Sequence, residues 1–266
     1  MIAVGAVIVR LKLLPTSFDS FGCATLHQHL CCFLIDDVVA VDAGSLATST
    51  TPEQKRAIRN VVLTHAHIDH VAGLPLFIDD LFVSLQEPLE VYALVEVIDI
   101  LETHIFNWKV YPRFSELKNQ FGEVLKYRAF LTGKEFKVAH LTFKAIKVNH
   151  KVPSVGLIIR DGDSRIAITG DTASMSEFWD AVNSESKLNA LLIECAFPND
   201  LQELANNSYH LTPKLLEEEL VKFRHTECPV YVINIKPMYY EKVLAELNQI
   251  NSFKVRTLQI GKTYEF

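Results

Sequence analysis

Hydrophobic and polar positions along the chain follow two periods. Short apolar runs predict β-strands, and longer stretches with an apolar residue at every third or fourth position predict amphipathic helices. The two kinds of segment alternate from one end to the other, and the strands are numerous enough for two sheets. The pattern therefore predicts an α/β fold built in layers. The expected strands are Ile2–Leu14, Leu30–Ile35, Val38–Asp42, Asn60–Thr64, Leu89–Ala93, Leu141–Val148, Val155–Arg160, Arg165–Thr169, Ala190–Glu194, Val230–Asn234 and Arg256–Ile260.

Turn residues predict where the chain connects these strands and helices. Asp161-Gly162 lies between two β-rich runs and predicts a hairpin. Thr51-Pro52-Glu53 and Thr212-Pro213-Lys214 each place a proline in the first turn of a helix. Both of these helices precede a strand, which suggests a duplicated arrangement without a residue-level repeat. The aromatic-rich region 95–120 predicts a helical insertion in a single domain that spans residues 1–266.

Composition excludes several classes of protein. The 266 residues are 49% hydrophobic and 22% charged, as in an ordinary folded soluble protein. Lys and Arg number 26 and Asp and Glu 32, so the net charge of −6 argues against binding to a nucleic-acid polymer or an anionic membrane. No stretch approaches the roughly 20 apolar residues that a membrane span needs. We therefore expect no membrane and no nucleic-acid partner.

Cysteine usage favours a cytoplasmic location. The five cysteines are odd in number and form no CxxC pair, which fits reduced thiols better than a disulfide framework. The apolar start Met1–Val9 leaves a signal peptide as the alternative. It lacks a basic leading segment and a small-residue cleavage site, and it runs into a strand-like alternation.

The segment His65-Ala66-His67-Ile68-Asp69-His70 holds four potential metal ligands at the end of the expected strand Asn60–Thr64. Where a strand ends in a loop, alternate side chains can turn towards one point. His65 and His67 can then bind one ion through neutral imidazoles, while Asp69 and His70 face a second. The chain has ten histidines, so chance clustering explains this segment poorly.

Further ligands are expected at later strand ends, because one loop cannot close two coordination shells. His150 follows the strand Leu141–Val148, and Asp171 follows another strand in the sequence Gly170-Asp171-Thr172. Gly170 permits close backbone approach. The two oxygens of a carboxylate can bridge cations about 3.5 to 4 Å apart, as in two-metal phosphoester hydrolases. Taken alone, a Gly-Asp pair fits an ordinary turn equally well.

These segments resemble the metallo-β-lactamase superfamily of metal-dependent hydrolases, and more narrowly the class II cyclic-nucleotide phosphodiesterases. The resemblance covers most of the chain and implies a four-layer αββα sandwich with a two-metal site at one edge. HxHxDH alone specifies only the superfamily, whereas HIFNW, HLTP and IKP in this order are more specific. The matching segments are HAHIDHVAGLP (65–75), HIFNW (104–108), HKVPS (150–154), IECAFP (193–198), HLTP (210–213) and IKP (235–237).

The resemblance also implies roles for individual residues. His65, His67, His150 and Asp171 would hold the first metal ion. Asp69, His70 and Asp171 would hold the second. His210 resembles the histidine that assists the leaving group, so Asp69 and His210 are the residues expected to act in catalysis. Two divalent ions are implied, with zinc expected and manganese or iron as alternatives.

The chain departs from the family at Asn234. A histidine stands just before IKP in the family and supplies the last ligand to the second metal, whereas this chain has Asn234. An amide oxygen is a weaker and harder ligand than imidazole, so the departure bears on the identity and occupancy of the second ion.

The implied reaction is hydrolysis of a 3′,5′-cyclic nucleotide, such as cyclic AMP or cyclic GMP, to the 5′-monophosphate. A hydroxide between two metal ions would attack phosphorus in line with the ribose 3′-oxygen. Lys236 and Lys151 are candidates to meet the phosphate, although most lysines are simply solvated. His29 is a candidate for the pocket wall. Asn107 belongs to the aromatic segment HIFNW, which can stack on a base or pack in the core.

Two other functions remain open. The same fold can cleave a lactone, a thioester or a linear phosphodiester such as an RNA 3′ trailer, although the net charge disfavours RNA. Alternatively, Asn234 marks a degenerate site that binds a nucleotide, or holds one metal ion structurally, without catalysis. The complete first ligand set and His210 argue against that reading. The expected partner is a small cyclic nucleotide, and the sequence leaves room for a homodimer.

Overall fold

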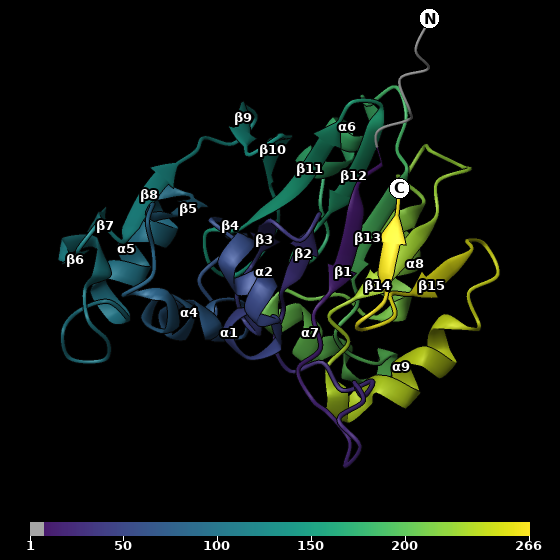
Figure 1. Ribbon diagram of the computed structural model, residues 1–266. Helices are drawn as coiled ribbons and strands as arrows, with labels where there is room; N and C mark the ends of the chain where they lie inside the picture. Colours follow the sequence, from purple (N-terminus) through teal and green to yellow (C-terminus); the bar gives the residue numbers. More distant parts are fainter. Residues whose placement is uncertain (1–7) are drawn as a thin grey trace, which may run out of the picture. The chain divides into compact units, whose positions relative to one another are not determined.

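The computed structural model describes residues 8–266 and divides into two compact units (Figure 1). We call Leu11–Leu131 with Ile260–Thr263 the N-terminal unit. Residues 8–10, Thr132–Gln259 and Tyr264–Phe266 form the C-terminal unit. Of the expected strand Ile2–Leu14, residues 2–7 lie outside the described part, and the described part contains β1.

The first sheet combines antiparallel and parallel strands in the order β16-β1-β2-β3-β4-β5-β8. β1, β2 and β3 pair antiparallel, and β3, β4, β5 and β8 pair parallel. The carboxyl ends of β3 and β4 therefore meet at one edge of the sheet. The strands are β1 (Arg10–Leu13), β2 (Phe33–Ile35), β3 (Val39–Val41), β4 (Asn60–Val62), β5 (Leu89–Ala93), β8 (Leu125–Ala129) and β16 (Thr263–Glu265).

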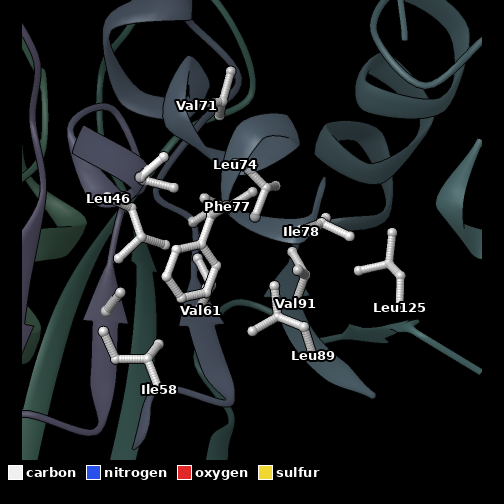
Figure 2. Close-up of a cluster of buried hydrophobic side chains, with 14 of the residues drawn as sticks. Leu46, Ile58, Val61, Val71, Leu74, Phe77, Ile78, Leu89, Val91 and Leu125 are labelled. Atoms are coloured by element: carbon white, nitrogen blue, oxygen red, sulfur yellow. The ribbon is translucent and has the colours of Figure 1, made fainter. Parts of the chain in front are cut away.

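The helices of the N-terminal unit bury one face of this sheet. In Figure 2, Phe77 and Leu74 of α4 pack on Val61 and Val91, and Leu46 of α1 lies beside them. α2 begins as predicted, with Pro52 in its first turn and Thr51 in a capping box with Gln54. Helical structure in the region 95–120 is limited to α5 and η1. The elements are α1 (Leu46–Ser49), α2 (Pro52–Ala57), α3 (Ile68–Val71), α4 (Gly73–Leu81), α5 (Val95–His104), the 3₁₀ helix η1 (Phe114–Glu116) and the hairpin β6 (Lys118–Asn119) and β7 (Gly122–Glu123).

The second sheet has the order β15-β14-β13-β12-β11-β10-β9. β9 to β12 pair antiparallel, and β12 to β15 pair parallel. The predicted hairpin is confirmed, because Asp161 of β11 pairs with Ser164 of β12. The strands are β9 (Glu135–Val138), β10 (Leu141–Lys147), β11 (Val155–Asp161), β12 (Ser164–Ile168), β13 (Ala190–Glu194), β14 (Val230–Ile233) and β15 (Val255–Thr257).

Helices cover this sheet with the apolar side chains that the sequence pattern predicted. Phe178 and Trp179 of α6, Leu216 of α8 and Val243 of α9 are buried in one cluster with the strand residue Val232. The elements are α6 (Glu177–Asn183), η2 (Asn199–Leu201), α7 (Gln202–Ser208), α8 (Pro213–Leu220), η3 (Pro237–Tyr239) and α9 (Tyr240–Leu247). The single-domain organisation stays a prediction.

Candidate metal centre

The segment 65–70 lies after β4, where the sequence placed it, and its last three residues belong to the short helix α3. His65 and His70 are buried, while His67 and Asp69 are half-buried. The ring centroids of His65 and His67 are 4.8 Å apart, and those of His65 and His70 are 4.1 Å apart. The N-terminal unit therefore gathers three imidazoles around one strand end.

A buried carboxylate at the end of β3 orients two of these imidazoles. Oδ2 of Asp42 lies 2.7 Å from Nδ1 of His70. The hydroxyl of Thr64 donates to the Asp42 carboxylate at 2.9 Å, and Thr64 Oγ1 lies 3.0 Å from Nδ1 of His65. Because a carboxylate only accepts, Nδ1 of His70 carries a proton. The single hydroxyl hydrogen of Thr64 points to Asp42. In the contact between Nδ1 of His65 and Oγ1 of Thr64, the imidazole nitrogen is therefore the donor. In both rings Nε2 is then the basic nitrogen, which is the form that binds metal ions.

The backbone around Asp42 packs closely against the same segment. Gly44 lacks a side chain where a Cβ would lie 2.0 Å from the carbonyl oxygen of Asp69, so only glycine fits there. The amide of Ala43 donates to the carbonyl of His70 at 2.7 Å. Asp42 itself has a φ of 59°, a left-handed conformation that aspartate tolerates better than most residues.

The C-terminal unit gathers a second group. His150 follows β10, Asp171 follows β12, and His210 lies between α7 and α8. One ligand atom from each of the three lies within 4.8 Å of the others. Asn234 follows β14, and its Nδ2 donates to Oδ1 of Asp171 at 2.6 Å. The parallel strands β12 and β14 thus end at the polar group, as predicted from their carboxyl ends.

His210 is held by a buried glutamate. Nδ1 of His210 lies 2.8 Å from Oε1 of Glu194, the last residue of β13, which also accepts from the amide of Thr172 at 2.9 Å. Burial lowers the pKa of His210, but the Glu194 carboxylate outweighs this effect and raises the pKa above its ordinary value. Burial raises the pKa of Glu194, against the opposing charge of His210. The Glu194 carboxylate therefore favours the protonated form of the His210 imidazole.

His150 is oriented by the backbone. Its Nδ1 lies 3.0 Å from the carbonyl oxygen of Tyr209. A carbonyl only accepts, so Nδ1 is protonated and Nε2 is the basic nitrogen. Tyr209 has a φ of 60°, a left-handed conformation at the end of α7 that is unusual for a bulky residue.

The residues present fit divalent metal ions. His65, His70 and His150 each have Nδ1 engaged by an oxygen, the outer contact that metal-binding histidines almost always make. Asp171 adds a buried carboxylate, which would be costly to ionise without a cation or a donor nearby. Imidazoles and carboxylates are donors that suit zinc, manganese or iron.

The four residues expected to contact substrate lie in different settings. Lys236 is half-buried, and its charge opposes the rise in the pKa of His210. Lys151 is exposed, with Nζ 5.3 Å from the centre of the Tyr209 ring. His29 is exposed on the segment before β2. The side chain of Asn107 accepts from the amides of Lys109 and Val110, so it stabilises a local turn. Contact of any of them with substrate stays a prediction.

Sequence reasoning missed Asp42, Thr64 and Glu194. Each lies at or next to a strand end that was predicted, and Glu194 even stands within the quoted segment IECAFP. The available signal was an acidic residue at the end of an apolar strand, which would have marked Asp42 and Glu194 as candidates.

Comparison with known proteins assigns the fold. A family model described as beta-lactamase superfamily domain matches residues 33–227, more than half of the chain. The chain belongs to this superfamily. The expected fold class, the αββα metallo-β-lactamase fold, is thereby confirmed, and the structure has two mixed sheets with helices packed on them.

Individual relatives include cyclic-nucleotide phosphodiesterases and a ribonuclease. The chain is 26% identical over 232 residues to a probable 3′,5′-cyclic-nucleotide phosphodiesterase of Yersinia pestis, across 76% of this chain and 65% of that protein. It is also 26% identical over 241 residues to ribonuclease Z of Limosilactobacillus fermentum, across 73% and 74%. Unliganded yeast PDE1 has a similar structure, with a TM-score of 0.76, 18% identity, and coverage of 97% of this chain and 99% of that one. The chain matches less than two thirds of the Yersinia protein.

In residues 8–266, no helix is long and apolar enough to cross a membrane. The cytoplasmic location and the homodimer stay predictions.

Proposed function

We propose that the protein is a metal-dependent phosphodiesterase that hydrolyses a 3′,5′-cyclic nucleotide to the 5′-monophosphate. The observation that carries this proposal is the pair of His210 and Glu194 beside His150 and Asp171. It places an imidazole that a carboxylate orients in the same group as two side chains suited to a metal ion. Similarity to cyclic-nucleotide phosphodiesterases supports the choice of substrate.

The proposed ligand sets are those that the resemblance to the family implies. His65, His67, His150 and Asp171 would hold one divalent ion, and Asp69, His70, Asp171 and Asn234 a second. When bound, such ions lower the pKa of a water molecule and neutralise charge on the phosphoryl oxygens. Asp42 and Thr64 fix the proton of His70 and His65 on Nδ1, so both rings are ready to bind through Nε2.

His210 would supply the proton to the leaving group. In hydrolysis, the oxygen of water adds to phosphorus, the bond from phosphorus to the 3′-oxygen breaks, and the 3′-oxygen takes a proton. Glu194 holds Nδ1 of His210, so Nε2 is the atom that delivers this proton. General acid help of this kind contributes about 10²- to 10⁴-fold to the rate.

Lysines and aromatic residues would complete the substrate site. We propose that Lys236 and Lys151 contact the phosphate, since both lie on the segments that carry Asn234 and His150. His29 and Asn107 are proposed to lie near the sugar or base. Phe197 packs its ring 5.6 Å from that of His210 and limits the movement of the proposed acid.

The direct test is product identification. Protein loaded with zinc or manganese should convert cyclic AMP or cyclic GMP to the 5′-monophosphate, and His67→Ala should not. Formation of the 3′-monophosphate would mean that the 5′-oxygen leaves and would contradict the proposed geometry. Absence of turnover with every divalent ion would reject the function.

Cleavage of a linear phosphodiester in RNA is the second candidate. The match to ribonuclease Z, which spans most of that protein, favours it. The net charge of −6 opposes it, because a polynucleotide backbone is bound mainly through cationic side chains.

A further inference from the structure

The side-chain amide of Asn234 has a hydrogen-bond partner for its nitrogen but, among residues 8–266, none for its oxygen. The residue follows β14, and its Nδ2 donates to Oδ1 of Asp171 at 2.6 Å. Its Oδ1 is buried, and among residues 8–266 it has no hydrogen-bond partner. A buried acceptor without a partner costs free energy, so such an atom normally has a ligand.

The backbone conformation at position 234 explains only in part why the residue is an asparagine. Asn234 has a φ of 58°, a left-handed conformation that asparagine and glycine adopt more readily than other residues. Glycine would satisfy this conformation without burying a polar atom. The side chain therefore has a role beyond the turn.

The bond to Asp171 orients the amide. Asp171 is almost fully buried, so its carboxylate gives Nδ2 a fixed acceptor. This contact also assigns the amide, since the nitrogen must face the carboxylate and the oxygen must face away. Oδ1 is thus held in a fixed orientation without a hydrogen-bond partner among residues 8–266, and a cation is one ligand that it can bind.

We infer that Asn234 makes the second ion site a weakly held site for a hard, oxygen-seeking ion such as Mn²⁺ or Mg²⁺, with Oδ1 as the ligand. The inference rests on the proposed ligand sets. The first set has three imidazoles and one carboxylate, whereas the second has two carboxylates, one amide oxygen and one imidazole. Imidazole-rich sites suit zinc, and oxygen-rich sites suit manganese or magnesium. The two ions should therefore differ in identity and in affinity.

Metal analysis tests this without any substrate. Protein stripped of metal is reloaded with zinc, dialysed and analysed for zinc per chain, and Mn²⁺ is then titrated by calorimetry or electron paramagnetic resonance. Wild type should keep one equivalent of zinc and bind one equivalent of Mn²⁺ more weakly. Asn234→His should keep two equivalents of zinc, because imidazole restores a nitrogen ligand.

Two further variants separate the side chain from the turn. Asn234→Gly suits the left-handed backbone and removes Oδ1, so the affinity for Mn²⁺ should fall about 10-fold or more while the first zinc is retained. Asn234→Asp supplies a charged oxygen at the same place and should bind Mn²⁺ more tightly than wild type. The retained first zinc serves as the internal control for folding in every variant.

Three results would overturn the inference: two zinc ions held equally tightly by wild type, unchanged zinc in Asn234→His, or unchanged Mn²⁺ affinity in both Asn234→Gly and Asn234→Asp. Failure of the proposed function has a different signature. In that case the metal counts follow the pattern above, and the loaded protein leaves cyclic nucleotides intact.

Discussion

Oδ2 of Asp42 lies 2.7 Å from Nδ1 of His70, and both side chains are almost fully buried. Asp42 follows β3, and His70 lies in α3, the short helix after β4. The pairing of the neighbouring parallel strands β3 and β4 brings these positions, 28 residues apart in the sequence, into contact. Asp42 also accepts from the amide and hydroxyl of Thr64, which contacts His65. One carboxylate thus sets the orientation of two proposed metal ligands.

Removing this carboxylate should weaken metal binding. Asp42→Asn keeps the shape and tolerates the left-handed backbone, but an amide cannot accept from both Thr64 and His70 as a carboxylate does. We expect metal affinity to fall about 10- to 100-fold, as for other outer contacts of metal-binding histidines. Competition with a chromophoric chelator measures the change. Asp80→Asn, which removes a surface ion pair with Lys55 in the same unit, should leave it unaltered; equal loss in both variants would contradict a specific role.

Loss of a direct ligand should be more severe. His67→Ala or Asp69→Ala should lower turnover by more than about 10³-fold, since the ions both activate water and neutralise the phosphate. Metal content should fall in parallel, and His140→Ala, which changes an exposed histidine, provides the control. A variant of His67 that keeps full metal content and activity would remove this residue from the ligand set.

His210→Ala should separate proton delivery from metal binding. With cyclic AMP, kcat should fall about 10²- to 10⁴-fold while metal content stays normal. With bis(p-nitrophenyl) phosphate the fall should be much smaller, because p-nitrophenolate leaves without protonation. Parallel loss of metal would instead make His210 a ligand, which its place within 4.8 Å of His150 and Asp171 allows.

Glu194 should set the pH range of that step. An acid must be protonated to act, so the rate should fall as pH rises through the pKa of His210. Because Glu194 raises this pKa, Glu194→Gln should move the alkaline fall in kcat/KM to lower pH. Profiles of wild type and variant at saturating metal test the shift, with Glu219→Gln as the control carboxylate. Identical profiles for wild type and Glu194→Gln would exclude His210 as the titrating acid.

Glu219 should stabilise the C-terminal unit. Its carboxylate accepts from Ser174 at 2.6 Å, from Nε1 of Trp179 at 2.7 Å and from Lys222 at 2.5 Å. Burial raises the pKa of Glu219, but these hydrogen bonds outweigh burial and lower it. Glu219→Gln should lower the free energy of unfolding by about 1 to 3 kcal/mol at neutral pH.

The pH dependence of this difference follows from the sign of the shift. A lowered folded-state pKa stabilises the protein above the unfolded-state value, about 4.3 for glutamate. The difference between wild type and Glu219→Gln should therefore be constant near neutral pH and shrink as pH falls through the folded-state pKa. Denaturation followed by tryptophan fluorescence measures it, and a difference that grows on acidification would contradict the assignment.

Much of the fold followed from the sequence because most strands carry buried apolar side chains, either in a continuous run or at alternate positions. β4, β5, β11 and β13 were predicted within one or two residues. β8, β9 and β16 were not predicted, because each is short or has mostly exposed and half-buried side chains that leave no apolar pattern.

The sequence predicted some residues of the candidate site and missed others. His65, His67, Asp69 and His70 are adjacent in sequence, so their chemistry is visible without a structure. Asp42 and Glu194 act through partners 28 and 16 residues away, and only the pairing of strands and the loop after α7 bring them together. The bond between Asn234 and Asp171 was likewise hidden, since 63 residues separate the two in the chain.

The proposed substrate is a small cyclic phosphodiester. Turnover of cyclic AMP and cyclic GMP should be compared at fixed metal concentration with that of a short RNA, a lactone and a thioester. The cyclic nucleotides should be the fastest substrates, and their binding should depend only shallowly on salt because a single phosphate releases few counterions. Faster turnover of the RNA or the lactone would contradict this proposal. It would mean that the site cleaves a different type of bond.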